Sequence, residues 1–129
     1  MTDCIFCKII KGEMPAYKVY EDEEFLAFLD IFPNTYGHTV VIPKQHEEWV
    51  WDYENLGKYF EVVGKLARHF REVVSEGVRS SIYGWEVPHA HIHLKPGRKD
   101  TLKGEKLSAD EMERIQERFK VSEPKYIKI

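Results

Sequence analysis

The alternation of hydrophobic and polar positions predicts that the first part of the chain is built from short strands. Between residues 17 and 42, apolar runs at 19–20, 25–29 and 38–42 are separated by turn-forming residues. Runs of this length, bounded by acidic, Pro, Asn and Gly residues, are typical of strands joined by tight turns. We therefore expect an antiparallel meander in this region.

The next segment of the chain has the hydrophobic spacing of a helix. From about residue 54 to 76, apolar side chains recur at the spacing of one helix face, and Gly77 follows as a stop signal. This pattern predicts the main amphipathic helix. His69 lies on this helix next to the apolar stripe, where we expect a structural role.

Two further strands and a last helix complete the expected fold. Residues 79–83 and 87–94 are expected to form strands around a turn at Gly84. Ser108 with Glu111 three residues later is a capping-box signature, which opens a helix.

Together these elements predict an α+β protein with an antiparallel sheet of about five strands, one long helix and a C-terminal helix. We expect helices to cover one face of the sheet and the other face to be free for a ligand. Residues 124–129 are expected to form a tail that packs against the body or another subunit.

Composition narrows the class of protein. A chain of 129 residues with 32% charged and 43% hydrophobic residues fits a single globular domain. The formal net charge of −3 argues against bulk binding to nucleic acid, which needs a concentrated basic surface. No run is apolar enough to span a bilayer, and nothing near Met1 resembles a signal peptide, so a cytoplasmic location without membrane partners is expected.

Three histidines at alternate positions, His89, His91 and His93, are the strongest chemical signal. If the segment is a strand, the three imidazoles share one face and Ala90, Ile92 and Leu94 share the other. Such a row can supply a nucleophile, proton donors or metal ligands.

The only two cysteines, Cys4 and Cys7, are spaced as C-x-x-C. In a chain without an export signal a structural disulfide is not expected. From the spacing alone they are a metal half-site, a redox pair or a chance arrangement. The redox alternative is the weaker one, because the pair does not lie in a thioredoxin-like βαβ pattern.

Four motifs in order resemble the histidine triad superfamily, and most of all its small nucleotide-binding branch. They are C-I-F-C-K-I at residues 4–9, F-L-D-I at 28–31, G-H-T-V-V-I-P-K at 37–44 with His46, and H-A-H-I-H-L at 89–94. The resemblance covers about residues 3–97, and the chain after Pro96 carries no motif of the family's chemistry.

The resemblance implies an enzyme that acts through a covalent nucleotidyl-histidine. His91 would be the nucleophile, and His93 and His38 would donate to the non-bridging phosphate oxygens. His91 can attack only if its other ring nitrogen donates to a fixed acceptor such as a strand carbonyl. The alternative for His38 is a surface histidine at the start of a strand.

The resemblance also assigns the nucleotide contacts. Asp30 would accept hydrogen bonds from the ribose hydroxyls, and the alternative is a solvated turn aspartate. Phe6, Met14, Phe28 and Ile31 would line the slot for a purine base, although each is equally typical of an ordinary core.

In zinc-carrying relatives the two thiolates are joined by the histidine after I-P-K and by the first histidine of the triad. In this chain the ligands would be Cys4, Cys7, His46 and His89, a set that suits a closed structural zinc site. The alternative is a pair of reduced thiols without metal. No organic cofactor is expected.

The segment before the triad departs from the family pattern. Trp85 and Glu86 stand where commoner members have Gln and Ser that hold the α-phosphate. An ionised Glu86 facing inward would repel a phosphate, but it can also face a cationic leaving group, donate a proton or point into solvent. Lys95 replaces an apolar residue, and we expect it to face away from the imidazoles together with Leu94, unless the strand ends or bulges there.

Three functions remain. The leading one is a purine nucleotide hydrolase or nucleotidyl transferase that cleaves a phosphoramidate or phosphoanhydride. The second is a non-catalytic nucleotide-binding or regulatory module with a structural zinc, and the third is a zinc-stabilised interaction protein. The resemblance further implies a homodimer formed through the long helix and an edge strand, with the aromatic residues just before that helix as a candidate surface.

Overall fold

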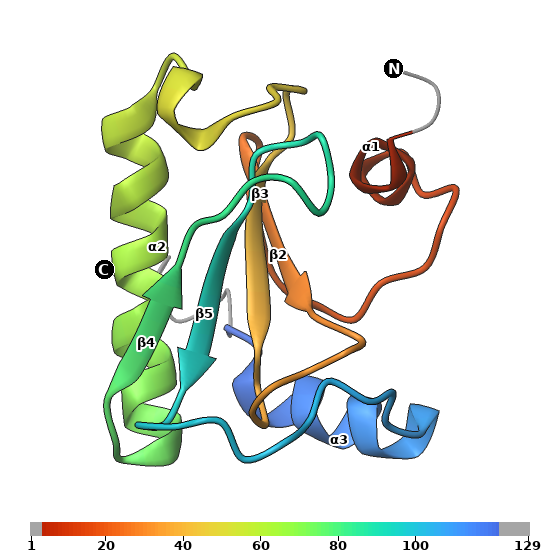
Figure 1. The fold of residues 1–129 in the computed structure, drawn as a ribbon, viewed down its shortest axis with the longest axis vertical. Helices are drawn as coiled ribbons and strands as arrows, with labels where there is room; N and C mark the ends of the chain where they lie inside the picture. Colours follow the sequence, from red (N-terminus) through yellow and green to blue (C-terminus); the bar gives the residue numbers. More distant parts are fainter. Residues whose placement is uncertain (1–3, 122–129) are drawn as a thin grey trace, which may run out of the picture.

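Figure 1 shows the computed structural model, which describes residues 4–121. The expected tail at residues 124–129 lies outside the described residues. The helices and strands of the structure are α1 (Ile5–Ile10), β1 (Lys18–Glu21), β2 (Phe25–Leu29), β3 (Thr39–Pro43), a 3-10 turn (Val50–Asp52), α2 (Leu56–Val74), β4 (Val78–Ser81), β5 (Ile92–Pro96) and α3 (Ala109–Phe119).

The strands form a five-stranded sheet in the order β1-β2-β3-β5-β4, in which every neighbouring pair is antiparallel. The expected α+β class and the meander of the first three strands are confirmed. β5 lies between β3 and β4, so its pairing of His93 with Val40 on one side and with Ser81 on the other places the last histidine in the middle of the sheet.

The main core lies between the sheet and the two longer helices. α2 runs along one side of the sheet in Figure 1 and buries Tyr59, Leu66 and Phe70 against it. The long helix expected from the hydrophobic period is confirmed, and it ends at Ser75, whose left-handed conformation terminates it before Gly77. Alternate residues of β2 and the apolar partners of the histidine row supply the facing side chains.

The sequence led us to expect that the second face of the sheet is free for a ligand. In the structure, part of this face is covered. Leu26, Phe28, Val40 and Ile42 on this face form another core with Cys4, Phe6 and Ile9 of the N-terminal segment. α1 therefore covers part of this face, which explains why all residues of β2 and β3 are buried. A helix of six residues is too short for its hydrophobic period to stand out in the sequence.

The strand predicted for residues 87–94 is partly wrong, because β5 begins only at Ile92. The amide of Ala90 donates to the carbonyl of Glu47 outside the sheet, so His89 and His91 lie in an extended lead-in to the strand. The alternation of faces nevertheless continues through this lead-in. Ala90 packs in the main core, whereas His91 contacts Phe6 on the opposite face.

α3 holds the loop that leads into β3. Its capping box at Ser108 and Glu111 is present as predicted. Phe119 at its end is fully buried, and its ring lies where a side chain at Gly37 would project. His69 on α2 donates from Nε2 to the carbonyl of Phe119 at 2.9 Å, as its expected structural role requires. Within residues 4–121, no helix has the length and apolar character that crossing a bilayer would require.

Candidate active site and metal centre

The second face of the sheet holds a cavity of about 460 Å³ between α1, the ends of β2 and β3, and β5. Every candidate catalytic and nucleotide-binding residue from the sequence lines it: Phe6, Met14, Phe28, Asp30, Ile31, His38, Glu86, His91 and His93. Residues that are far apart in the sequence therefore meet in one place, which is the property expected of a ligand site.

The apolar end of the cavity is formed by α1 and β2. The rings of Phe6 and Phe28 meet edge to face with 5.4 Å between centroids, and both are buried. These two residues thus belong to the second core and also line the cavity. Met14 and Ile31 are exposed, so an ordinary core position is excluded for them.

His38 and His93 are joined in a chain of hydrogen bonds that fixes where their protons lie. The amide of Asn34 donates to Nδ1 of His38 at 3.0 Å, and Nε2 of His38 lies 3.0 Å from Nδ1 of His93. Burial lowers the pKa of His38 to about 3 and that of His93 to about 4, so both rings are neutral at pH 7.

The protons in this chain can be assigned from the backbone amide. Since Nδ1 of His38 accepts, the single proton of His38 is on Nε2 and is donated to Nδ1 of His93. The proton of His93 is then on Nε2, which is buried and has no hydrogen-bond partner among residues 4–121. The chain leaves one unpaired N–H donor at the cavity, and His38 has no second donor to offer.

Asp30 lies beside this chain. Its Oδ1 accepts from the amide of Phe32 at 2.9 Å, and its Oδ2 lies 3.6 Å from Nε2 of His38. Burial raises the pKa of Asp30 above its ordinary value, partly offset by the Phe32 amide. Asp30 lines the cavity, so its carboxylate can accept further hydrogen bonds there.

His91 has the opposite arrangement from His93. Its Nδ1 lies 2.8 Å from the carbonyl of His89 and must donate to it, so the lone pair for an attack can only be on Nε2. That nitrogen points toward the cavity and lies 3.1 Å from Oε1 of Glu86, to which it donates as long as the carboxylate is ionised; the lone pair becomes available when this proton is given up. The acceptor that the sequence required for His91 is therefore a carbonyl of the lead-in to β5.

Glu86 points inward rather than into solvent. Burial acts to raise the pKa of Glu86, but its own backbone amide and His91 outweigh this and hold the pKa below the ordinary value. The side chain still has 47% of its surface exposed, so it has room to turn. Its neighbour Trp85 is largely exposed and does not line the cavity.

The expected orientation of Lys95 is wrong. Leu94 packs in the main core, whereas Lys95 lines the cavity with His91 and His93. The reason is the two-residue period of the strand, because positions 93 and 95 share a face while position 94 points to the other. The strand continues to Pro96 without a bulge between β3 and β5, and the same parity in the sequence would have revealed this residue.

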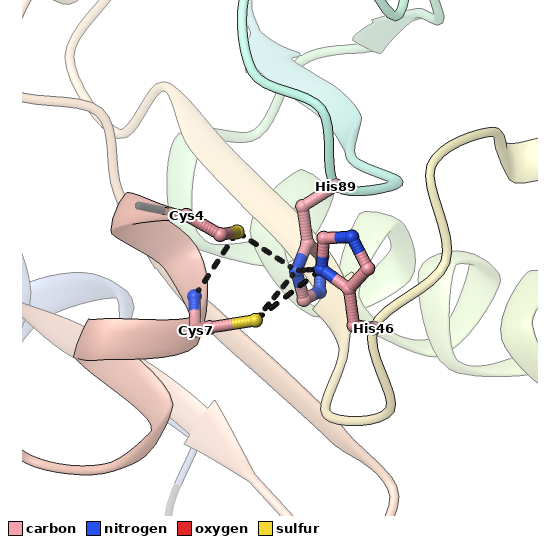
Figure 2. Close-up of side chains that lie close together, drawn as sticks. All are labelled: Cys4, Cys7, His46 and His89. Carbon is pink, nitrogen blue, oxygen red and sulfur yellow. Dashed lines mark hydrogen bonds between the residues drawn. The ribbon is translucent and has the colours of Figure 1, made fainter. Parts of the chain in front are cut away.

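A separate cluster of possible metal ligands lies at the other end of the histidine row (Figure 2). It joins Cys4 and Cys7 of the N-terminal segment, His46 after β3 and His89, with all ligand atoms within 4.8 Å of one another. Both cysteines are free thiols. Nε2 of His89 lies 2.8 Å from the carbonyl of Pro43, which fixes that proton and turns the lone pair of Nδ1 toward the sulfur atoms.

The family model described as "HIT domain" matches residues 11–100. The chain belongs to the HIT domain family. The matched region holds the cavity histidines, Asp30 and two of the four possible metal ligands, but it does not include Cys4 or Cys7.

Individual relatives agree with this assignment. An uncharacterized HIT-like protein of Borreliella burgdorferi is 42% identical, covering 91% of this chain and 94% of its own. The adenosine 5'-monophosphoramidase HNT1 of Saccharomyces cerevisiae is 38% identical over 75% of this chain and 64% of its own. A zinc-bound histidine triad family protein from Mycobacterium smegmatis has a TM-score of 0.75 and 34% identity, covering 92% of this chain and 91% of its own.

Proposed function

We propose that this HIT protein binds a purine mononucleotide or its ester or amide and cleaves the bond at the α-phosphate through His91. The observation that carries the proposal is the pairing of opposite ring nitrogens in the cavity. The proton on Nδ1 of His91 is held by a carbonyl, so Nε2 is the nitrogen that can present a lone pair once it releases its proton to Glu86. Neighbouring His93 carries an unpaired N–H at Nε2, with 5.3 Å between the ring centroids.

The binding mode follows from the lining of the cavity. The base would lie against Phe6 and Phe28, with Met14 and Ile31 at the exposed edge of the slot. The carboxylate of Asp30 would accept from the ribose hydroxyls. This arrangement leaves the α-phosphate beside His91 and His93.

The reaction has two displacement steps. The lone pair of His91 Nε2 forms a bond to phosphorus while the bond to the leaving group breaks and its electron pair departs with that group. A water molecule then attacks phosphorus, the bond to Nε2 breaks, and the nucleoside monophosphate is released. His93 would donate to a non-bridging oxygen in both steps, and loss of one such donor typically lowers kcat by about 10² to 10³.

Glu86 would have to move during this cycle. Its Oε1 occupies the space in front of Nε2 of His91 that the phosphorus atom must enter. We propose that the ionised carboxylate takes the proton from Nε2 of His91 and swings aside on its exposed half, which frees the lone pair. Glu86 then passes this proton to the leaving group and, as a carboxylate again, takes one from the attacking water.

The enzymatic proposal is tested with an adenosine phosphoramidate. The wild-type protein should release AMP, and His91→Ala should lower the rate by at least about 10³-fold, since it removes the nucleophile. Denaturing mass spectrometry during turnover should detect a nucleotidyl adduct on His91. Equal rates for the wild type and His91→Ala would refute catalysis through this residue.

The contact between Glu86 and His91 also favours a second candidate, a nucleotide-binding module without turnover. A carboxylate held at the attacking nitrogen would then be a permanent obstacle. Saturable AMP binding in calorimetry combined with no AMP release would support this candidate and exclude the enzyme.

We further propose that Cys4, Cys7, His46 and His89 hold a structural zinc ion, and the spacing of the donor atoms supports this. A tetrahedral ion about 2.3 Å from sulfur and about 2.05 Å from nitrogen separates S–N pairs by about 3.5 Å and the N–N pair by about 3.3 Å. Three of the four S–N distances are 3.3, 3.5 and 3.3 Å, and the N–N distance is 3.2 Å. The remaining pairs of ligand atoms lie within 4.8 Å of each other.

Hydrogen bonds alone do not explain this cluster. Nδ1 of His89 approaches both sulfur atoms and Nδ1 of His46, although one ring nitrogen carries at most one proton. With four protein ligands the ion has no open position and would tie α1 to the chain around His46 and His89. It would thereby steady the carbonyl of His89 that orients His91.

Metal analysis of untagged protein tests the zinc site. We expect about one zinc per chain, and Cys4→Ser should lower both the zinc content and the thermal midpoint. Substoichiometric zinc that Cys4→Ser leaves unchanged would contradict the assignment. Because a thiolate site requires reduced cysteines, we also propose that the protein resides in the cytoplasm.

A homodimer is proposed as well. β4 is an edge strand of the sheet, and its unpaired backbone groups can pair with the same strand of a second copy. Exposed Phe60 on α2 and exposed Trp51 supply apolar surface. Light scattering should give twice the mass of the chain, and a monomer at micromolar concentration would refute this.

A further inference from the structure

Lys95 is the only lysine or arginine among the described residues that line the cavity. The cavity also contains two carboxylates, Asp30 and Glu86, while His38 and His93 are neutral because of burial. Without Lys95, a site that is proposed to hold a phosphate would contain two carboxyl groups and no permanent positive charge. Such a site would repel its own ligand.

The register of the sheet places Lys95 in a row of polar side chains. Arg79 on β4 is its direct partner, and Thr39 pairs with Leu94, so His38 lies next to Lys95 on the other side. Asp30 follows beyond His38, to whose carbonyl it donates its amide at 2.9 Å. The row therefore runs from the proposed ribose contact to the edge of the sheet, and Lys95 lies in the middle of it.

The two cations of this row differ in what already binds them. Arg79 donates from Nε to the carbonyl of Gly97 and from Nη1 to Asp100, both at 2.9 Å. No carboxylate oxygen of residues 4–121 lies within 4.0 Å of the ammonium of Lys95. The charge of Arg79 is thus neutralised by the protein, whereas that of Lys95 is left for a ligand.

The field of Lys95 reaches the groups around the proposed phosphate position. Burial is the largest influence on the pKa of all three neighbours: it raises the pKa of Asp30 and lowers those of His38 and His93. The nearby ammonium acts to lower the pKa of each of them. The ammonium of Lys95 is therefore a second hydrogen-bond donor toward this part of the cavity, in addition to the unpaired Nε2–H of His93.

We propose that Lys95 is a specificity-determining residue that binds the phosphate oxygens of the nucleotide, so that the site selects nucleoside phosphates over nucleosides. The inference rests on the proposed nucleotide site but not on its catalytic activity. A lysine ammonium acts as a compact point charge, so it recognises the charge of the phosphoryl group rather than the base or the leaving group.

Calorimetric binding of adenosine and AMP tests this. In Lys95→Met, AMP should bind about tenfold more weakly, the usual effect of losing a charged hydrogen bond, while adenosine binding stays within about twofold. Lys95→Arg should recover most of the AMP affinity because it restores the charge. Added salt should weaken AMP binding by the wild type more than by Lys95→Met.

Arg98→Met is the matched control, because it also removes one positive charge and lies only three residues after Lys95. The side chain of Arg98 is 83% exposed and lies outside the cavity. Its AMP affinity should equal that of the wild type. The inference is overturned if Lys95→Met binds AMP normally, if it loses adenosine and AMP in parallel, or if Arg98→Met has the same effect. A wild-type protein that binds neither ligand would refute the nucleotide site itself.

Discussion

The buried neutral histidines should make the stability of this protein fall steeply between pH 7 and pH 5. In the unfolded chain an imidazole takes up a proton below about pH 6.5, but folded His38 resists protonation down to about pH 3 and folded His93 down to about pH 4. The unfolded state therefore binds more protons in this window, so lowering the pH favours unfolding.

The size of the effect follows from these pKa values. At pH 5 an unfolded histidine is almost fully protonated and gains about 2 kcal/mol relative to pH 7, whereas the folded ring gains almost nothing. His38 and His93 together should lower the free energy of unfolding by about 4 kcal/mol. This is a large part of the about 5–15 kcal/mol that stabilises a typical domain.

Urea unfolding of the wild type and of His38→Gln at pH 7, 6 and 5 measures this effect. Glutamine offers an acceptor and a donor to the same neighbours without titrating, so the loss between pH 7 and pH 5 should be smaller by about 2 kcal/mol. Contributions from the four possible metal ligands, which His38 does not contact, occur in both proteins and cancel in the difference. Equal losses in the wild type and His38→Gln would refute the reasoning.

Three further predictions test the support and the ligand contacts of the site. Gly37→Ala should lower the free energy of unfolding by at least about 1–3 kcal/mol, because Gly37 has a φ of +90° and faces the ring of Phe119; an unchanged urea midpoint would contradict this. Phe119→Ala should cost about 3–5 kcal/mol in the same assay, while Phe32→Ala, at a position with 53% exposure, should cost far less, and similar losses would be inconsistent with the packing. Asp30→Asn should weaken adenosine binding in calorimetry but leave 2',3'-dideoxyadenosine unaffected, and parallel losses for both ligands would exclude a ribose contact.

Much of the fold follows from local patterns in the sequence. The strands of the meander and α2 were predictable because their hydrophobic periods extend over several residues and end at clear turn signals. α3 was predictable from the capping box that begins at Ser108. α1 was not, because six residues cover less than two helical turns, and with it the covering of the second face of the sheet was missed.

The candidate site was predictable in composition but not in its hydrogen bonding. The sequence identified nine of the residues that line the cavity and the four that cluster as possible metal ligands. The role of the Asn34 amide was out of reach, because no sequence pattern records which backbone group a histidine contacts. The orientation of Lys95 could have been predicted from the sequence, because residues two positions apart in a strand such as β5 share a face.

The two histidines of the proposed reaction owe their opposite properties to acceptors and donors at opposite ends of the row. The carbonyl of His89, one of the four possible metal ligands, holds a proton of His91 on Nδ1. The amide of Asn34 acts through His38 to hold the proton of His93 on Nε2.

Identical side chains two residues apart can thus present a lone pair and an N–H donor to one phosphate, because separate parts of the backbone fix each ring. α3 belongs to this arrangement even though it contributes no residue to the cavity. Phe119 packs against Gly37, directly before His38, and so supports the loop through which the Asn34 amide reaches its histidine.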